Sequence, residues 1–254
     1  MFPYIHLFGR VFGTYGVCMA LAVILVGLFS CRSLKRFGGR WEDVLIVGGV
    51  AVCLGLLGSK LLYIFVTYSI SEVIAFLKAG DMSFLSSGGI VFYGGLIGGI
   101  LGAVLGCRIA KCPFSAMERA VTPYLPMGHA IGRVGCFMAG CCYGAPYEGP
   151  LAVHYPNAVS GLSPEQGYFP VQLTEAALNM VIFGILLLLR RKKRRPLRLL
   201  GAYIGMYGVV RFVLEFFRGD EIRGITAGLS TSQWIAVGMV AASCLFLCIK
   251  TKKK

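Results

Sequence analysis

Residues 11–30 read "VFGTYGVCMALAVILVGLFS", a stretch without a single charged side chain. An α-helix rises 1.5 Å per residue, so about 20 residues are enough to cross a hydrocarbon layer of roughly 30 Å. The residues around this stretch do not have the pattern of a cleaved signal peptide, which needs a basic leader and a small-residue cleavage site. We therefore expect a permanent membrane-spanning helix here.

Further apolar stretches follow along the chain, and the whole sequence is 57% hydrophobic and only 14% charged. The long ones cover 44–66, 88–107, 171–189, 199–217 and 232–249. A weaker stretch at 114–130 is interrupted by Pro123 and Pro126. The sequence predicts an all-α integral membrane protein, with a single domain over 1–254 and about seven transmembrane helices.

The net charge of +14 is distributed in a way that indicates topology rather than nucleic-acid binding. With seven spans, most basic residues fall in alternate loops, and the richest segments are "RRKKRRPLR" at 190–198 and "KTKKK" at 250–254. The positive-inside rule then predicts the N-terminus outside and the C-terminus inside. The loop at 140–169, which is rich in Gly and Pro, would face outward as an ordered active-site loop. We expect no nucleic-acid partner.

Ionisable groups inside the apolar segments are the first candidates for function. Arg211 lies in the middle of 199–217, and Tyr207 and Glu215 lie four residues before and after it. Spacing of four places these side chains on one helical face. Because a charge at mid-membrane costs about 2.5–3.5 kcal/mol, it is rarely without a role. Either Arg211 and Glu215 form a structural pair, or Arg211 binds an anion.

Arg133 supplies a second charge, between Gly132 and Gly135, which allow close backbone approach. A guanidinium presents a planar fork of donors that suits a phosphate group. Two arginines from separate segments therefore predict a clamp on a lipid phosphate. Gln172 and Glu175 follow Pro170 and would either orient an arginine or cap the helix that begins there.

Three of the ten cysteines, Cys136, Cys141 and Cys142, stand beside Arg133 in the predicted outward segment. With His129 they could bind a soft metal, although the C-x4-C-C spacing and the adjacent cysteines disfavour chelation. A disulfide, close packing, or a thiol active in group transfer are the other possibilities. We expect no metal and no cofactor, and leave the role of the thiols open.

Six segments together resemble the bacterial prolipoprotein diacylglyceryl transferase family over nearly the whole chain. They are "TYGVCMALAV" (14–23), "GGIVFYGGLIGG" (88–99), "GRVGCFMAGCCYG" (132–144), "PVQLTE" (170–175), "YGVVRFVLEFFRGD" (207–220) and "LSTSQW" (229–234). The resemblance implies a multi-pass enzyme of the bacterial inner membrane. Its reaction moves the diacylglyceryl group of phosphatidylglycerol to the lipobox cysteine thiol of a preprolipoprotein and releases glycerol phosphate.

The same resemblance implies which residues form the site. Arg133 and Arg211 match the family's essential arginines. The matched positions associated with substrate binding are Tyr15, Gly132, Gly135, Cys136, Gly144, Gln172, Glu175, Tyr207 and Glu215. The implied partners are phosphatidylglycerol, preprolipoprotein signal peptides and membrane lipid.

The chain departs from the family pattern where a base would be expected. Tyr93 stands where the family usually has a histidine, Phe169 replaces another histidine, and Cys136 replaces an asparagine. His129, four residues before Arg133, is a candidate to remove the thiol proton, because its pKa is ordinarily near neutral. We therefore name Arg133, Arg211, His129 and Tyr93 as the catalytic candidates.

Two other functions are compatible with the same residues. A divergent family member would modify another thiol acceptor. A non-enzymatic protein would use the arginine clamp to bind or transport phospholipid without releasing glycerol phosphate.

Overall fold

The computed structural model describes residues 2–7, 9–86, 89, 91–190, 197–219 and 224–248. Most of the basic segment at 190–198, Arg223 and the closing "KTKKK" lie outside the described residues. The described chain divides into two compact units, one made of residues 1–33 and 118–254 and the other of 34–117. The prediction of a single domain stays a prediction.

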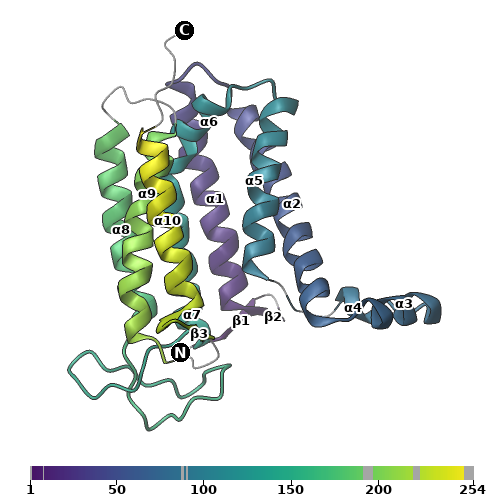
Figure 1. The fold of residues 1–254 in the computed structure, drawn as a ribbon, viewed down its shortest axis with the longest axis vertical. Helices are drawn as coiled ribbons and strands as arrows, with labels where there is room; N and C mark the ends of the chain where they lie inside the picture. Colours follow the sequence, from purple (N-terminus) through teal and green to yellow (C-terminus); the bar gives the residue numbers. More distant parts are fainter. Residues whose placement is uncertain are drawn as a thin grey trace. The chain divides into compact units, whose positions relative to one another are not determined.

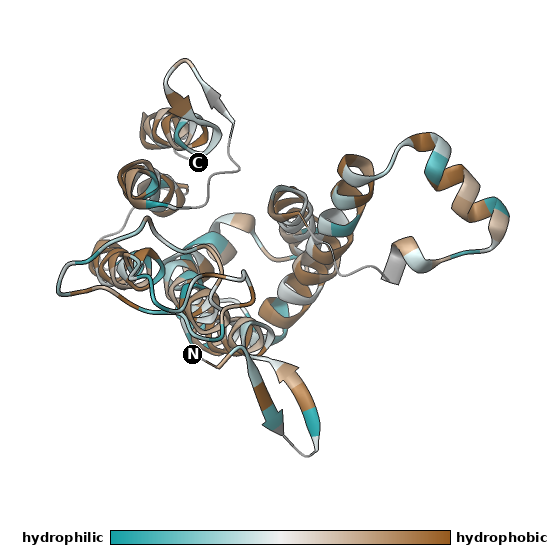
Figure 2. Ribbon diagram, turned by 90° about the horizontal axis from the view of Figure 1, so that it is seen from below, coloured by the Kyte–Doolittle hydropathy of each residue, from teal (hydrophilic) through white to brown (hydrophobic). Residues whose placement is uncertain are grey.

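Six of the described helices are long and apolar enough to cross a membrane. They are α1 (Thr14–Lys35), α2 (Trp41–Thr67), α5 (Phe92–Ile109), α8 (Val171–Arg190), α9 with the 3-10 turn η2 (Arg198–Phe217) and α10 (Thr231–Cys248). Each coincides with a predicted span to within a few residues. Large apolar side chains stay exposed along them, which suits contact with lipid. Figure 2 colours much of these helices brown, the colour of hydrophobic residues. The inside and outside assignment stays a prediction.

The weak seventh stretch is broken into shorter pieces. Helix α6 (Phe114–Val121) is followed by a 3-10 turn, η1 (Thr122–Tyr124), and then by α7 (Leu125–Ala139). Pro123 and Pro126 lack the amide hydrogen that continues a helix, and each stands in the first turn of the next element, where this loss is tolerated. None of these pieces reaches the length of a span, so a crossing here stays a prediction.

The second unit is a helix pair joined through glycine. Gly94, Gly98, Gly102 and Gly106 recur every four residues on α5 and are buried against α2. A Cβ added at Gly102 or Gly106 would lie 2.7 Å from the backbone of Ala51 or Val47. These glycines therefore let the two helix backbones pack closely, as small residues do in membrane helices. Short helices α3 (Ile70–Ala79) and α4 (Ser83–Ser86) complete the unit.

The first unit gathers α7, α8, α9 and α10, together with α1. The long loop between α7 and α8 lies at one end of these helices, at the bottom of the view in Figure 1. As predicted it is ordered without helices, and Val153 and Tyr168 exchange backbone hydrogen bonds of 3.0 Å across it. Two short hairpins, β1 (Tyr4–Leu7) with β2 (Arg10–Gly13) and β3 (Ile225–Thr226) with β4 (Leu229–Ser230), precede α1 and α10.

Candidate active site

Glu175 lies at the centre of a buried polar cluster in the first unit. Pro170 precedes α8, and Gln172, Glu175 and Asn179 share the face of that helix turned into the bundle. The Glu175 side chain is 1% exposed. A carboxylate this deeply buried needs opposite charge and hydrogen-bond donors around it.

Helix α7 supplies the first of these partners. Arg133 Nε lies 3.0 Å from Glu175 Oε1, and His129 Nε2 lies 3.5 Å from the same oxygen. The two side chains meet one oxygen because they stand four residues apart on one face of the helix. The spacing of four between His129 and Arg133 in the sequence therefore places both side chains against Glu175.

Helix α9 closes the cluster from the other side. The Tyr207 hydroxyl donates to Glu175 Oε1 at 2.8 Å, and the Tyr203 hydroxyl lies 3.4 Å from His129 Nδ1. The His129 and Tyr207 rings are in contact, tilted at 57° with centroids 4.7 Å apart. Tyr203 was not among the predicted site residues, although its spacing of four from Tyr207 places both on one face.

Arg211 follows one turn after Tyr207 and forms an ion pair with Glu215, with Nη2 2.6 Å from Oε2. Its Nη2 also donates to Ser232 Oγ at 3.2 Å, and Ser230 Oγ donates to Glu215 Oε1 at 2.8 Å. Arg211 Nη1 is buried and has no hydrogen-bond partner among the residues that the structure describes. This donor is available for an anion.

The two arginines lie in the same bundle. Arg133 pairs directly with Glu175, and Arg211 pairs with Glu215 one turn after Tyr207, which donates to Glu175. The Arg133 and Arg211 side chains are 16% and 11% exposed. In a medium of low dielectric constant, buried guanidinium groups of this kind favour binding of an anion such as phosphate.

The predicted glycines allow neighbouring segments to approach α7 closely. A Cβ at Gly135 would lie 2.9 Å from Cys18 Cβ, and one at Gly132 would lie 3.3 Å from Met19 Sδ, both on α1. Tyr15, at the start of α1, consequently lies beside Gly135. Gly144 packs so closely on the Phe169 and Phe217 carbonyls that a Cβ there would clash with backbone.

Gln172 holds the loop that follows α7. Its Nε2 donates to the Cys141 carbonyl at 2.9 Å, and its Oε1 accepts from the Tyr155 hydroxyl at 3.1 Å. Gln172 and Tyr155 are fully buried. The substrate contact expected of Gln172 stays a prediction, whereas its contact with the loop was not foreseen. No periodic pattern distinguishes Tyr155 in the sequence, so the prediction missed it.

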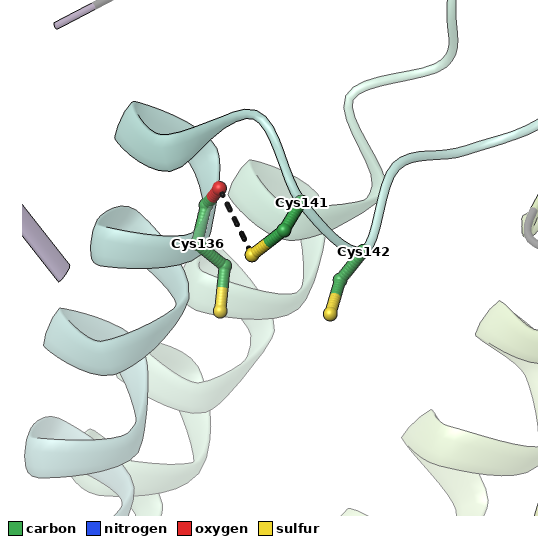
Figure 3. A group of neighbouring side chains, drawn as sticks. All are labelled: Cys136, Cys141 and Cys142. Atoms are coloured by element: carbon green, nitrogen blue, oxygen red, sulfur yellow. Dashed lines mark hydrogen bonds between the residues drawn. The ribbon is translucent and has the colours of Figure 1, made fainter. Parts of the chain in front are cut away.

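The three cysteines beside Arg133 come together at the end of α7. Their sulfur atoms all lie within 4.8 Å of one another, and the side chains point into the same space (Figure 3). The Cys141 thiol donates to the Cys136 carbonyl at 3.7 Å. All three are free thiols in this structure, so no disulfide joins them.

Tyr93, the remaining catalytic candidate, belongs to the second unit. It lies in the first turn of α5 with 43% of its surface exposed. Its part in catalysis stays a prediction.

Comparison with known proteins gives one consistent result. The family described as prolipoprotein diacylglyceryl transferase matches residues 4–249. A phosphatidylglycerol–prolipoprotein diacylglyceryl transferase of Clostridium tetani is 33% identical over 91% of this chain and 90% of its own. Those of Clostridium perfringens and Idiomarina loihiensis are 32% and 31% identical, over 96% and 94% of this chain and 95% and 88% of their own. With Arg133, Glu175 and Arg211 gathered in one bundle, the chain belongs to the prolipoprotein diacylglyceryl transferase family.

Proposed function

We propose that this chain transfers the diacylglyceryl group of phosphatidylglycerol to the lipobox cysteine thiol of preprolipoproteins, in the bacterial inner membrane. The observation that carries the proposal is the buried cluster in which Arg133 pairs with Glu175, Tyr207 donates to the same carboxylate, and Arg211 follows one turn later on α9. Family membership supports the same reaction. The six candidate spans support a location within the bilayer, where phosphatidylglycerol is found.

The arginines act on the leaving group. As the acceptor sulfur bonds to the glycerol carbon, the carbon–oxygen bond to the phosphate breaks, and the electron pair stays on the phosphate oxygen. Arg211 Nη1, which is buried and has no hydrogen-bond partner among the described residues, stabilises that charge together with Arg133. Donors that are already in position in a low-dielectric site stabilise a developing charge without reorganising. Glycerol phosphate leaves and a thioether remains.

The other cluster residues position the arginines and handle the proton. Glu175 Oε1 contacts both the Arg133 guanidinium and the Tyr207 hydroxyl, and so fixes the position of Arg133. Glu215 fixes Arg211 in the same way through an ion pair. His129, which contacts this network, receives the acceptor thiol proton. A thiol has a reference pKa near 8.5, so making the thiolate at neutral pH costs about 2 kcal/mol.

The test is a reconstituted assay that separates transfer from transport. The full chain is placed in vesicles that contain phosphatidylglycerol with a labelled headgroup, and a lipobox peptide is added. Release of labelled glycerol phosphate that requires both the peptide and its cysteine is expected. Movement of phosphatidylglycerol between leaflets without that release would overturn the proposal in favour of a transporter. Release with a small thiol but not with the peptide would favour a different acceptor.

A further inference from the structure

The cysteine cluster has a geometry that the family motif does not call for. Helix α7 ends at Ala139 and is capped by Gly140, whose φ of 71° turns the chain so that the Cys141 amide donates to the Cys136 carbonyl at 3.1 Å. Cys142 also adopts a left-handed conformation, with φ at 55°. Such a conformation costs energy in a residue other than glycine, so the surrounding structure must impose it.

This backbone removes the main objection to metal binding at adjacent cysteines. Successive side chains in an extended segment point in opposite directions, which disfavours chelation by neighbours. The turn at Cys142 instead brings the Cys141 and Cys142 thiols to the same side, toward Cys136 (Figure 3). In a tetrahedral zinc site with 2.3 Å bonds, two sulfurs lie about 3.8 Å apart. The three sulfurs, within 4.8 Å of one another, need only a small adjustment.

The loop is fixed on several sides. Gln172 holds the Cys141 carbonyl, the Ala145 amide donates to the Phe217 carbonyl at 2.9 Å, and the Gly219 amide donates to the Tyr143 carbonyl at 3.3 Å. These bonds tie the cysteine loop to α8 and to the segment after η2. Ligands that are held in place before the metal arrives lose little entropy on binding.

Two arginines stand on segments that border the cysteine loop. Arg133 precedes Cys136 by three residues on α7, and the backbone of Arg218 pairs with that of Gly144. Three thiolates and one zinc ion carry a net charge of −1, which these guanidinium groups can offset in a partly buried site.

We propose that Cys136, Cys141 and Cys142 bind one zinc ion, and that its fourth coordination position receives the thiol of the acceptor cysteine. The group contains three cysteines and no fourth protein ligand among the described residues. Zinc sites with three protein ligands keep an open position for a water molecule or a substrate. This assignment differs from the sequence-based expectation of no metal, and it rests on the proposed function.

The zinc ion would supply the activation that the replaced histidines cannot. A thiol that coordinates zinc is deprotonated, and zinc changes no oxidation state in the process. The proton passes through water to His129, because seven residues, about 10 Å along the helix axis, separate His129 from Cys136 on α7. The acceptor sulfur then bonds to the glycerol carbon, the bond from that carbon to the phosphate oxygen breaks, and glycerol phosphate leaves. The thioether product is a weaker ligand than a thiolate and dissociates.

The first experiment measures metal content without any reference to turnover. The full chain is purified under reducing conditions, stripped with a chelator, incubated with zinc and analysed by mass spectrometry. We expect about one zinc ion per chain, and at least a tenfold loss of zinc affinity in Cys136→Ser, Cys141→Ser and Cys142→Ser. Cys53→Ser, at an exposed thiol of α2, is the matched control and keeps the zinc. Wild-type protein that takes up no zinc overturns the inference.

The second experiment tests the open position. Cobalt(II) replaces zinc, and its thiolate charge-transfer absorption is recorded while a lipobox peptide is added. The absorption increases with the cysteine peptide and not with a serine peptide. An equal response to both peptides overturns the assignment of the fourth position. The readout uses the wild-type fold, so it does not depend on whether the cysteine variants fold.

The third experiment separates this inference from the proposed function. Glycerol phosphate release is measured on metal-free and zinc-loaded protein. We expect release to fall about a hundredfold without zinc and to return when zinc is added. Equal release in both overturns the zinc inference and leaves the transferase assignment standing. Zinc binding without release in either sample overturns the transferase assignment, and with it the role of zinc in catalysis.

Discussion

The α2–α5 pair and the α7–α10 bundle are both built from apolar helices, but the residues buried between the helices differ. Between α2 and α5, glycines bring backbones together and no buried ion pair appears among the described residues of that interface. In the α7–α10 bundle, the Arg133–Glu175 and Arg211–Glu215 ion pairs are buried, and Tyr207 donates to Glu175. Lipid gives helices no hydrophobic reason to associate, so close packing holds the first pair together. Buried charge is costly, so its retention in the second indicates function.

The largest expected effect is at Arg211. If buried charge in the α7–α10 bundle serves function, a substitution there should reduce turnover and leave the fold intact. Arg211→Lys keeps the charge that balances Glu215 and removes the fork of donors that includes Nη1. Glycerol phosphate release should fall about a hundredfold or more. Arg190→Lys, at the far end of α8, is the matched control and should keep its activity. Full activity in Arg211→Lys would place phosphate binding elsewhere.

His129→Gln comes next, because it removes the proton acceptor and keeps a hydrogen-bonding side chain. General acid–base catalysis contributes at least about a hundredfold, so release should fall by about that factor. The pH dependence of release should flatten on the acid side. His154→Gln, in the loop between α7 and α8, serves as the control. Unchanged turnover and an unchanged pH profile would remove His129 from the mechanism.

Gly98→Ala tests the α2–α5 pair, because it should reduce the stability of that pair and leave the cluster around Glu175 unchanged. The added Cβ would clash with the Leu54 carbonyl, and overpacking of this kind costs about 1–3 kcal/mol. Thermal unfolding in detergent measures the change. Gly49→Ala, on α2 with open space around its Cβ position, should leave the unfolding temperature unchanged or raise it. Equal behaviour of the two variants would show that glycine packing does not hold this unit together.

Tyr207→Phe has the smallest expected effect. It removes one donor to Glu175 Oε1, and Arg133 and His129 remain on that oxygen. The loss of one hydrogen bond to a charged group, about 1.5 kcal/mol, should lower turnover roughly tenfold. Tyr63→Phe in the second unit is the control. A loss as large as that of Arg211→Lys would mean that Tyr207 touches the substrate.

The spans and most of the buried cluster could be predicted from the sequence. Long uncharged runs are read directly as helices, and spacing of four places His129 with Arg133 and Tyr207 with Arg211. The interruption of the stretch at 114–130 by Pro123 and Pro126 was also predicted, but not that it divides into α6, a 3-10 turn and α7. Tyr155 and Ser230 were missed, because their contacts join residues far apart in the chain.

The sequence by itself determined the apolar helices and the residue types of the site, because length, hydropathy and helical spacing are local properties. The sequence also showed three cysteines close to Arg133, but it did not decide among the possible roles of these thiols. Only the tertiary structure decided that Arg133, His129 and Tyr207 contact one oxygen of Glu175. It also decided that left-handed backbone at Gly140 and Cys142 brings three sulfur atoms within 4.8 Å of one another. Convergence of this kind depends on the packing of separate helices and on backbone angles, which spacing along one helix does not specify.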